Sequence, residues 1–471
     1  MQFRIGKRPE RLMKVSIIGT GYVGLTTGVC LAWLGHEVAC MDTDGEKIAK
    51  LKQGVCPIHE PHLAELLGEV GKKLRFTTEA EESIAGVQVV FIAVGTPPLE
   101  DGSPDLQYLR MAAQAAGRHL NDNFTVVVNK STVPIGSGNW VESLIRESYE
   151  ARHGRKPTRR YAVASNPEFL REGSALQDSL YPDRVVVGAD STRALEVLYT
   201  LYRPLLEQSF PTPAYLPRPD GLGAVPLVAT DLASAELIKY AANAFLALKI
   251  SYINEIAWLA EKVGADVQMV AKGIGLDSRI GTRFLQAGIG WGGSCFGKDT
   301  AALVATGAEY GIDMPIVKAA REVNRRQRER VVEKLLGELK ILKGRTIGLL
   351  GLAFKPHTDD LRDAPALEIA QALVQRGVRV KVHDPVAMGR ARIEHPDLSL
   401  YYCETAEQVA EEADAVVLVT DWAQYQNLDW KTMGATMAGS GRRVPLLLDG
   451  RNFLDASRLE SAGIRVVRLA G

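Results

Sequence analysis

Residues 14–25 read KVSIIGTGYVGL, and they decide the fold of the first third of the chain. A β-branched strand runs into a glycine turn, and the apolar segment LTTGVCLAWLG (25–35) predicts a helix after it. Gly19, Gly21 and Gly24 complete a G-x-G-x-x-G spacing between strand and helix, the context in which this spacing indicates dinucleotide binding. The first glycine makes the tight turn, the second lets the backbone approach a pyrophosphate, and the third brings helix against strand.

An acidic residue at the end of the next strand favours NAD over NADP. HEVACMD (36–42) predicts a strand that ends at Asp42, which lies 18 residues after Gly24. A carboxylate there accepts hydrogen bonds from ribose hydroxyls and repels a 2′-phosphate. Lys47, one turn into the following helix, is a second candidate for the adenosine ribose, although a solvated helix lysine explains it equally well.

Two further predicted strands end in small or hydroxyl-bearing residues. They are QVVFIAVG (88–95) and TVVVNKST (125–132), and a helix from about Asp105 to His119 separates them. Ligands gather at the carboxyl ends of strands in open parallel sheets. Thr96, Ser131 and Thr132 are therefore candidates for contacts with the nicotinamide ribose or with water, unless their hydroxyls only cap the next helix.

A loop rich in carboxylates follows the predicted strand Tyr161–Ser165. It reads NPEFLREGS (166–174), in which Pro167 restricts the preceding residue to an extended conformation. Glu168 and Glu172 are expected at helical spacing. Ordinary solvated charge would explain the pair, but its place just after a strand end also suits acid–base chemistry.

One cysteine is set among glycines in GWGGSCFGKDT (290–300). Buried structural cysteines normally lie among apolar residues, so Cys295 is a candidate nucleophile. Lys298 would favour the reactive thiolate, and the flexible Gly292–Gly293 backbone would let a substrate come close. The alternative is a glycine-rich turn that happens to contain a cysteine.

A long apolar helix is predicted from about Asp231 to Val263, where Gly264 ends it. Lys239 and Asn243 lie one turn apart on one face of this helix. Polar groups on the apolar side of a helix are costly without partners, so the pair predicts a polar pocket; a solvent-facing position is the alternative. The remaining circumference is apolar, which predicts a spine between two lobes and a dimer surface.

Strand–helix alternation resumes in the last third of the chain and predicts a second parallel sheet. GRTIGLLGLAF (344–354) is expected to form a strand and a turn. The further expected strands are VRVKVHDP (378–385), AVVLVTDW (415–422) and VPLLLDGRN (444–452), and the expected helices are PALEIAQALVQRG (365–377) and TAEQVAEEAD (405–414). The preceding basic helix, residues 317–336, is interpreted as carrying a solvated charged face. We therefore predict an α/β fold with two Rossmann-like parallel-sheet domains joined by a long central helix.

The second predicted sheet has cations where the first has glycines. Its turn GLAFKPHTDDLRD (351–363) lacks the G-x-G-x-x-G spacing and carries Lys355 and Arg362, and Arg451 follows the last strong strand. Surface cations would explain each residue singly. Their common position at strand ends suits a phosphorylated ligand.

Composition limits the classes of function. The 471 residues suggest about three domains, and 46% hydrophobic with 24% charged residues is typical of a soluble globular protein. Basic and acidic residues are equal at 56 each, so no nucleic-acid or membrane partner is indicated. The five widely spaced cysteines show no metal-binding pattern and predict reduced thiols in a cytoplasmic protein. No signal peptide or membrane span is expected.

Nine motifs occur in an order that resembles the UDP-glucose/GDP-mannose dehydrogenase family. They are GTGYVGL (19–25), VGTPPLEDGSPDL (94–106), KSTVPIG (130–136), SNPEFLREG (165–173), KYAANAFLALKISYINE (239–255), RIG (279–281), GWGGSCFGKD (290–299), LAFKPHTDDLRDAP (352–365) and DGRN (449–452). The resemblance covers nearly the whole chain from Met13. It implies a four-electron oxidation of a nucleotide sugar's primary alcohol to a carboxylate, with two NAD+ used in turn.

The resemblance also implies a catalytic role for each matching residue. Cys295 would attack the aldehyde to give a thiohemiacetal, and a second hydride transfer would yield a thioester that water hydrolyses. The other catalytic residues would be Glu168 as general acid/base, Thr132 and Asp299 to hold the water, and Lys239 and Asn243 to stabilise charge on the substrate oxygen.

The resemblance further implies binding residues and a domain order. Cofactor contacts would come from Gly19, Gly21, Tyr22, Val23, Gly24, Asp42, Lys47, Thr96, Ser131, Glu172, Lys298 and Arg362. Contacts to the sugar nucleotide would come from Phe169, Leu170, Gly292, Phe354, Lys355 and Arg451, and from Arg279 of a neighbouring subunit, which implies at least a homodimer. The expected boundaries are an extension at 1–12, an NAD-binding domain at 13–225, a central helical linker and dimerisation domain at 226–335, and a UDP-sugar-binding domain at 336–471.

Three alternatives remain at this point. The motifs favour UDP-glucose, with UDP-glucuronate as product, over GDP-mannose or a UDP-N-acetylhexosamine. A two-electron hydroxyacid dehydrogenase would use the glycine turn with Lys239 and Asn243, but it has no use for Cys295. A non-catalytic nucleotide-binding scaffold would need none of these side chains.

Overall fold

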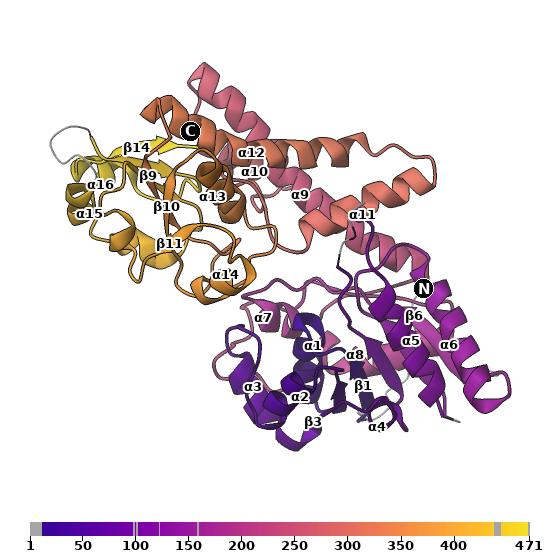
Figure 1. Cartoon of the computed structure of the whole chain (residues 1–471). Helices are drawn as coiled ribbons and strands as arrows, with labels where there is room; N and C mark the ends of the chain where they lie inside the picture. Colours follow the sequence, from indigo (N-terminus) through magenta and orange to yellow (C-terminus); the bar gives the residue numbers. More distant parts are fainter. Residues whose placement is uncertain are drawn as a thin grey trace. The chain divides into compact units, whose positions relative to one another are not determined.

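The structure is a computed structural model of the chain, and it describes residues 12–97, 99, 102–121, 123–157, 160–437 and 444–469 (Figure 1). The expected N-terminal extension, residues 1–12, therefore lies almost wholly outside the described residues. The chain divides into two compact units between Ala241 and Ala242, and this division falls within helix α9 (Leu232–Val263). The domain boundaries expected at 225/226 and 335/336 stay predictions.

The first unit is built on an eight-stranded sheet in the order β3-β2-β1-β4-β5-β6-β7-β8. The first six of these strands in the sheet run parallel, β7 pairs antiparallel with β6, and β8 runs parallel to β7. The strands are β1 (Lys14–Ile18), β2 (Glu37–Met41), β3 (Leu74–Thr77), β4 (Val89–Ile92), β5 (Thr125–Asn129), β6 (Tyr161–Ser165), β7 (Val185–Gly188) and β8 (Leu227–Thr230).

Helices cover both faces of the first sheet, and this explains why its central strands are apolar throughout. Every residue of β4 and β5 is buried, as parallel strands between two helical layers require. The helices are α1 (Tyr22–Trp33), α2 (Gly45–Lys52), α3 (Leu63–Val70), α4 (Ala80–Ile84), α5 (Gln107–His119), α6 (Ser137–His153), α7 (Ala175–Leu180) and α8 (Thr192–Leu206). Residues of α4, α5 and α6 share one apolar core with β4 and β5, and residues of α1, α3, α7 and α8 share another.

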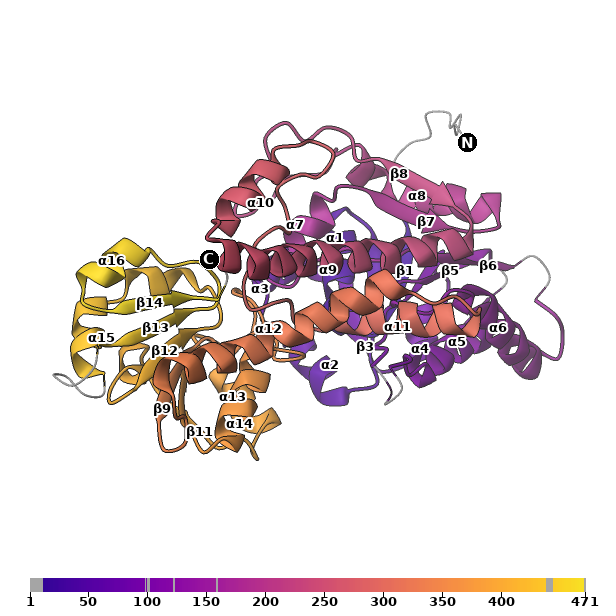
Figure 2. The ribbon, with the colours of Figure 1, turned by 90° about the horizontal axis from the view of Figure 1, so that it is seen from above.

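The second unit contains a six-stranded parallel sheet in the order β11-β10-β9-β12-β13-β14, which is drawn in orange to yellow in Figure 2. Its strands are β9 (Thr346–Leu350), β10 (Arg379–His383), β11 (Leu400–Tyr402), β12 (Ala415–Leu418), β13 (Leu446–Asp449) and β14 (Arg465–Arg468). Its helices after α9 are α10 (Val267–Gly275), α11 (Phe296–Glu309), α12 (Pro315–Leu339), α13 (Pro365–Gln375), α14 (Met388–Glu394), α15 (Trp430–Thr436) and α16 (Ala456–Ser461).

The predicted fold class is confirmed, because both parallel sheets and the long helix α9 are present. One predicted helix is wrong. The segment at 405–414 forms only a short 3₁₀ helix, Glu407–Val409, and Glu412 adopts a φ of +57°, a left-handed conformation that a right-handed helix cannot include.

Candidate active site

The glycine turn between β1 and α1 has the geometry that a phosphate ligand requires. Gly19 adopts a φ of +100°, and a Cβ there would lie 2.5 Å from the Ala93 carbonyl oxygen, so only glycine fits. A Cβ on Gly24 would come within 1.9 Å of the Gly19 carbonyl oxygen. A Cβ on Gly21 would meet nothing within 4 Å, and no side chain caps the N-terminus of α1. The free space and the N–H groups of this helix end suit a pyrophosphate.

Asp42 lies directly after β2, and its carboxylate faces the glycine turn. Its Oδ2 accepts hydrogen bonds from the backbone N and the Oγ1 of Thr20, at 2.8 and 2.7 Å. Lys47 on α2 reaches the same oxygen at 3.2 Å. Burial raises the pKa of Asp42, but the hydrogen bonds from Thr20 and Asp44 and the charge of Lys47 together outweigh it, so the net shift of the pKa is downward. The side chain is therefore an ionised acceptor at neutral pH, as binding of ribose hydroxyls requires.

Glu60 is a residue of this region that sequence reasoning missed. It is buried, and it accepts hydrogen bonds from the Tyr22 hydroxyl and from the backbone N of Gly173 and Ala175, the last two at 2.6 Å each. It thereby ties the first turn of α1 to the loop that carries Glu172. Glu60 is the only acidic residue between Pro57 and Pro61, and no local pattern marks it as functional.

The ends of β4 and β5 are held together by the hydroxyls that were predicted there. Thr96 Oγ1 donates to the Thr132 carbonyl oxygen at 2.9 Å, and Ser131 Oγ donates to the Val94 carbonyl oxygen at 2.8 Å. The hydroxyl protons of Thr96 and Ser131 are therefore engaged in hydrogen bonds to backbone carbonyls of the protein. Each hydroxyl oxygen keeps lone pairs with which it can accept a hydrogen bond from a ligand.

Glu168 and Lys239 form a buried ion pair in the first unit. Lys239 Nζ lies 2.8 Å from Glu168 Oε1, and the side chains are only 5% and 8% exposed. The other carboxylate oxygen accepts a hydrogen bond from Leu170 N at 2.8 Å. Burial raises the pKa of Glu168, but Lys239 and then Lys130 outweigh it and lower the pKa below its usual value. Glu168 is therefore a carboxylate, ready to accept a proton.

Lys130 is a second buried cation near this pair, and sequence reasoning had not assigned it a role. Its Nζ donates to Asn166 Oδ1 at 3.0 Å, and the Tyr202 hydroxyl donates to the same oxygen at 2.6 Å. Burial lowers the pKa of Lys130 to about 8, although the charge of Glu168 opposes the shift. Lys130 immediately precedes the predicted Ser131 and Thr132, and only that position could have pointed to it.

The loop at 166–174 is not helical, so the predicted helical spacing of Glu168 and Glu172 is wrong. The next helix, α7, begins only at Ala175, because the Glu168 carboxylate accepts the N–H of Leu170 and favours a turn there. Phe169 lies in this loop beneath a cation, with the Arg184 guanidinium 3.7 Å from the centre of its ring.

Cys295 stands at the N-cap of α11 in the second unit, and its side chain is exposed. The positive end of a helix dipole favours a thiolate at this position. The neighbouring Ser294 Oγ lies 3.7 Å from the sulfur. An exposed thiol at the start of a 14-residue helix has the setting of a reactive cysteine.

Asn243 on α9 is hydrogen-bonded to Asp299, which follows this thiol by four residues along the chain. Asn243 Nδ2 donates to Asp299 Oδ2 at 2.6 Å, and both side chains are buried. Asp299 N donates to the Cys295 carbonyl oxygen at 2.8 Å, while Lys298 Nζ lies 3.9 Å from Asp299 Oδ1. The second unit thus brings four of the predicted residues into one group around the first turn of α11.

Close packing, and not flexibility, explains the glycines before Cys295. A Cβ on Gly292 would lie 2.4 Å from the Asp363 carbonyl oxygen. Gly293 has a φ of +85°, and a Cβ there would come within 2.7 Å of the Phe354 ring. The interpretation of this pair as a flexible backbone is therefore corrected: the glycines let the cysteine loop pack against residues 354–363.

The basic helix α12 is not wholly solvated, contrary to the prediction. Arg328 is 7% exposed, forms ion pairs with Asp363 and Glu368, and donates to the Trp291 carbonyl oxygen at 3.0 Å. Arg321 donates to the Gly297 carbonyl oxygen at 2.7 Å. These arginines face the start of α11 because the carbonyls of the cysteine loop need donors. The more exposed Arg325 and Arg326 do form a solvated charged face.

The predicted cations of the second unit differ in their surroundings. Arg451 donates to the carbonyl oxygens of Val419, Gly290 and Phe354, at 2.7 to 3.2 Å, so it connects loops as well as standing at a strand end. Arg362 is paired with Asp360, and Lys355 Nζ lies 5.4 Å from the centre of the neighbouring Phe354 ring. Arg279 is 87% exposed and pairs with Asp277.

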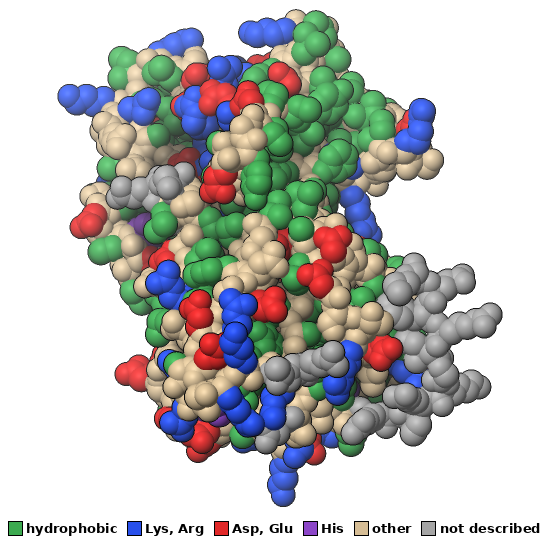
Figure 3. Space-filling model, turned by 90° about the vertical axis from the view of Figure 1, so that its right-hand side faces the viewer, with side chains coloured by type: hydrophobic (Ala, Val, Ile, Leu, Met, Phe, Trp, Pro, Cys, Tyr) green, Lys and Arg blue, Asp and Glu red, His purple; other side chains and the backbone are tan. Residues whose placement is uncertain are grey.

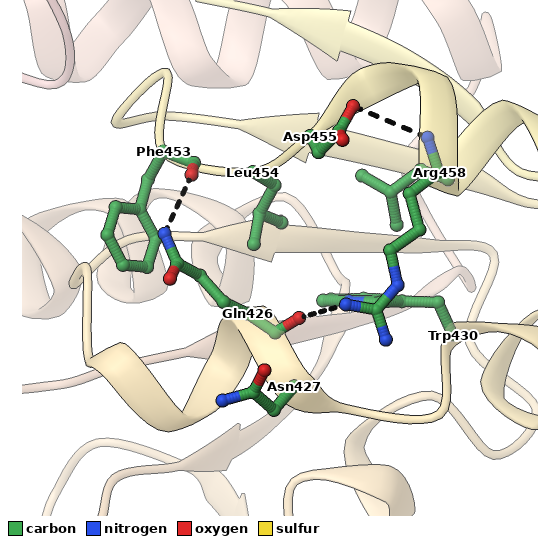
Figure 4. A pocket seen from close by; sticks show the side chains of 8 residues that line it. Gln426, Asn427, Trp430, Phe453, Leu454, Asp455 and Arg458 are labelled. Carbon is green, nitrogen blue, oxygen red and sulfur yellow. Dashed lines mark hydrogen bonds between the residues drawn. The ribbon is translucent and has the colours of Figure 1, made fainter.

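A cavity of about 300 Å³ lies elsewhere in the second unit, beside α15 and α16 (Figure 4). Among the residues that the structure describes around it, Trp430 is buried, whereas Gln426 and Arg458 are exposed. Gln426 Nε2 donates to the Phe453 carbonyl oxygen at 3.3 Å, and Arg458 Nη1 donates to the Gln426 carbonyl oxygen at 2.9 Å. Its described lining contains no predicted catalytic or binding residue.

The described residues contain no group of three or more His, Cys, Asp or Glu side chains that would hold a metal ion. None of the described helices is long and apolar enough to cross a membrane.

A parallel sheet with a glycine turn, an acidic second strand end and an uncapped first helix is typical of a dinucleotide-binding domain of the Rossmann type. The chain belongs to the UDP-glucose/GDP-mannose dehydrogenase family. The family's NAD-binding domain matches residues 13–206, its central domain residues 233–326, and its UDP-binding domain residues 348–456. The protein is an NAD-dependent nucleotide-sugar dehydrogenase.

Individual relatives agree with this assignment. The chain is 45% identical to a UDP-glucose 6-dehydrogenase of Rhizobium meliloti (strain 1021), with 96% of this chain and 98% of the relative covered. It is 42% identical to UDP-glucose 6-dehydrogenase TuaD of Bacillus subtilis (strain 168), with 96% and 92% covered. The structure of a UDP-glucose dehydrogenase from Pyrobaculum islandicum has a TM-score of 0.86 at 38% identity, with 99% of both chains covered.

Proposed function

We propose that this enzyme is a UDP-glucose 6-dehydrogenase, which oxidises the C6 alcohol of UDP-glucose to the carboxylate of UDP-glucuronate. The similarity to UDP-glucose 6-dehydrogenases over nearly the full length supports this substrate. The observation that carries the four-electron reaction is the exposed thiol of Cys295 at the N-terminus of α11, one turn before the buried pair Asp299–Asn243. A two-electron dehydrogenase needs no such nucleophile.

The thiol holds the intermediate between two oxidations. The glycine turn and Asp42 would hold NAD+, which would supply a hydride acceptor for C6 in each of the two oxidations. Cys295 adds to the aldehyde after the first oxidation and forms a C–S bond, and the resulting thiohemiacetal becomes a thioester when the second hydride and a proton leave. Water then cleaves the C–S bond, which releases the carboxylate and restores the thiol. The covalent bond keeps the reactive aldehyde from escaping.

Polar and charged side chains carry out proton transfer, stabilisation of negative charge and positioning of the water. Glu168 is held as a carboxylate by two lysines, so it can take the proton of the attacking water. Lys239 and Asn243 donate toward the oxygen on which negative charge develops, and Thr132 and Asp299 position the water. The buried Asn243–Asp299 hydrogen bond of 2.6 Å keeps two of these groups in register between α9 and α11.

The working form is proposed to be a homodimer formed through α9. Phe245, Tyr252 and Leu259 recur every seven residues along this helix, and their side chains are 61%, 49% and 60% exposed. Hydrophobic side chains also gather on the face shown in Figure 3. A stripe of large apolar groups on a long helix suits a second copy of the helix. The exposed Arg279 would then reach the substrate of the other subunit.

Replacement of Cys295 tests this proposal. Cys295→Ala is expected to reduce UDP-glucuronate formation by at least about a thousandfold, because no thioester can form. Cys56→Ala, which removes a half-buried thiol that no step uses, is the control and should retain wild-type turnover. Product is measured by chromatography. Unchanged UDP-glucuronate formation by Cys295→Ala would contradict the thioester route, and faster wild-type turnover of GDP-mannose or a UDP-N-acetylhexosamine would contradict the substrate.

A further inference from the structure

Glu236 is a buried carboxylate of the first unit to which the proposed mechanism gives no role. It lies on α9, one turn before Lys239, and its side chain is among the buried charged groups, with the residue 3% exposed. Its Oε2 accepts a hydrogen bond from Gly136 N at 2.7 Å, and its Oε1 accepts one from Gly138 N at 2.9 Å. Both donors belong to the start of α6, so Glu236 caps this helix from another element of the fold.

The α6 N-terminus has no cap of its own. Gly136 occupies the N-cap position with a φ of +91°, and it has no side chain that could accept the first N–H groups. Gly138 allows α9 to come close, since a Cβ there would lie 3.1 Å from Leu232 and 3.3 Å from Glu236 Oε1. The carboxylate therefore supplies two acceptors to N–H groups that the helix itself leaves without partners, one on the exposed Gly136 and one on the buried Gly138.

The segment that ends at this cap carries the proposed water ligand. Residues 130–136 join β5 to α6 and include Ser131 and Thr132. A cavity of about 10 Å³, the size of one water molecule, is lined by Ser131, Thr132, Val133, Ser165, Pro167, Glu236, Lys239 and Tyr240. Glu236 thus holds the C-terminal end of the segment, while its own helix turn presents Lys239 on the same small cavity.

We propose that Glu236 is a positioning residue for thioester hydrolysis, which fixes the Thr132 segment against the turn of α9 that carries Lys239. This inference rests on the proposed function. Thr96 Oγ1 and Ser131 Oγ already fix the N-terminal end of the segment on the β4 side, so Glu236 provides the anchor of its C-terminal end. Without that second end fixed, Thr132 moves relative to Lys239 and the water is held in a poorer geometry. A displacement of about 1 Å at a reacting group can cost about a hundredfold in rate.

Glu236→Gln tests the proposal, with Ser191→Ala as the matched control. The amide keeps one acceptor oxygen but turns an NH2 group toward a backbone N–H, so one anchor bond is lost. Ser191 caps α8 in the same unit through the N–H of Ala194, and it does not line the cavity. Both variants lose a helix cap, and only the first loses the anchor of the Thr132 segment.

The diagnostic measurement is the fraction of Cys295 that carries a covalent sugar nucleotide during turnover, read by intact-protein mass spectrometry. In Glu236→Gln we expect kcat to fall about tenfold, KM values for UDP-glucose and NAD+ to stay within about twofold, and the thioester to accumulate. Thr132→Ala should accumulate the same adduct, and the double variant should lose less than the sum of the two changes. Ser191→Ala should retain wild-type kcat without any adduct.

Two results would overturn the inference. One is a wild-type kcat in Glu236→Gln, and the other is a lower kcat without adduct, which would mean that the cap serves stability alone. If Glu236→Gln does not fold, Glu236→Asp replaces it, since it shortens the side chain by one methylene and should accumulate the adduct as well. Absence of any carboxylate product from the wild type would instead remove the proposed function, and the inference with it.

Discussion

The first six strands of the first sheet and the six strands of the second sheet have the same order, but the aspartates at their carboxyl edges have different surroundings. The orders β3-β2-β1-β4-β5-β6 and β11-β10-β9-β12-β13-β14 follow the same 3-2-1-4-5-6 pattern. A glycine with φ near +100° follows the first strand of each, at +100° for Gly19 and +101° for Gly351. In both, a Cβ would collide with the loop after the neighbouring strand, at Ala93 or at Thr420.

The aspartate after the second strand shows how the two edges diverge. Asp42 keeps a side chain that is 14% exposed and leaves it available to a ribose. Asp384 is 0% exposed, and five N–H groups donate to it, those of Leu352, Ala353, Val386, Ala387 and the Trp422 indole. The same topology thus places the same residue type in a fully buried site in one sheet and in a partly exposed site, where it accepts from Thr20 and Lys47, in the other. Strand order alone does not identify a cofactor site.

The largest expected effect is a loss of folding stability when Asp384, the fully buried aspartate of the second sheet, is replaced. Asp384→Asn turns an NH2 group toward backbone N–H donors in a buried site. We expect it to lower the free energy of unfolding by about 2–4 kcal/mol. Denaturant unfolding of the full chain measures the loss. The KM for NAD+ should stay within about twofold of wild type. A large rise in that KM would contradict the claim that Asp384 stabilises the fold without a role in cofactor binding.

The matching substitution in the first sheet should affect binding instead. Asp42→Asn is expected to raise the KM for NAD+ about tenfold, which corresponds to about 1.4 kcal/mol, and to narrow the preference for NAD+ over NADP+. The unfolding free energy should change by less than about 1 kcal/mol, because the site is partly exposed and Thr20 can still donate. Initial rates at varied NAD+ measure the effect. An unchanged KM combined with lost stability would mean that both aspartates serve the fold.

The smallest expected effect concerns a second pair of corresponding strand ends. β13 ends at Asp449, whose carboxylate accepts the N–H groups of Phe453 and Leu454, whereas β5 is followed by the buried Lys130 near Glu168. Because the charge of Lys130 helps to lower the pKa of Glu168, Lys130→Met should raise it. A base with a higher pKa is protonated at higher pH, so the acid limb of the kcat–pH profile should move upward by about half a pH unit.

The control for this pH measurement is Lys72→Met, which removes an exposed lysine of the same unit. It should leave the profile unchanged. A shift toward lower pH in Lys130→Met would mean that Lys130 does not act on Glu168 through its charge.

Local patterns predicted the parts of the site that are local in the chain. The glycine turn, Asp42, Cys295 and the Lys239–Asn243 spacing could all be read because strand, turn and helix signals adjoin them. The partners of Glu236 lie about 100 residues away in sequence, and those of Arg328 lie 35 and 40 residues away, so no local pattern reveals them.

The errors have the same physical origin. At Glu168 the carboxylate accepts the N–H of Leu170 and pairs with Lys239, 71 residues away, and both bonds hold the loop in a non-helical conformation. The glycines at 292 and 293 were interpreted as flexible because the residues that crowd them, Asp363 and Phe354, follow more than 60 positions later. In each case contacts with residues distant in the sequence contributed to the local conformation, and local sequence propensity cannot reveal such contacts.

The most direct test of the central claim is the number of NADH molecules formed per UDP-glucose consumed. With limiting UDP-glucose and excess NAD+, absorbance at 340 nm gives the NADH, and chromatography gives the remaining sugar nucleotide. A thiol that retains the aldehyde until the second oxidation predicts a ratio near two, with UDP-glucuronate as the product. A ratio near one, with free aldehyde in solution, would contradict the role assigned to Cys295.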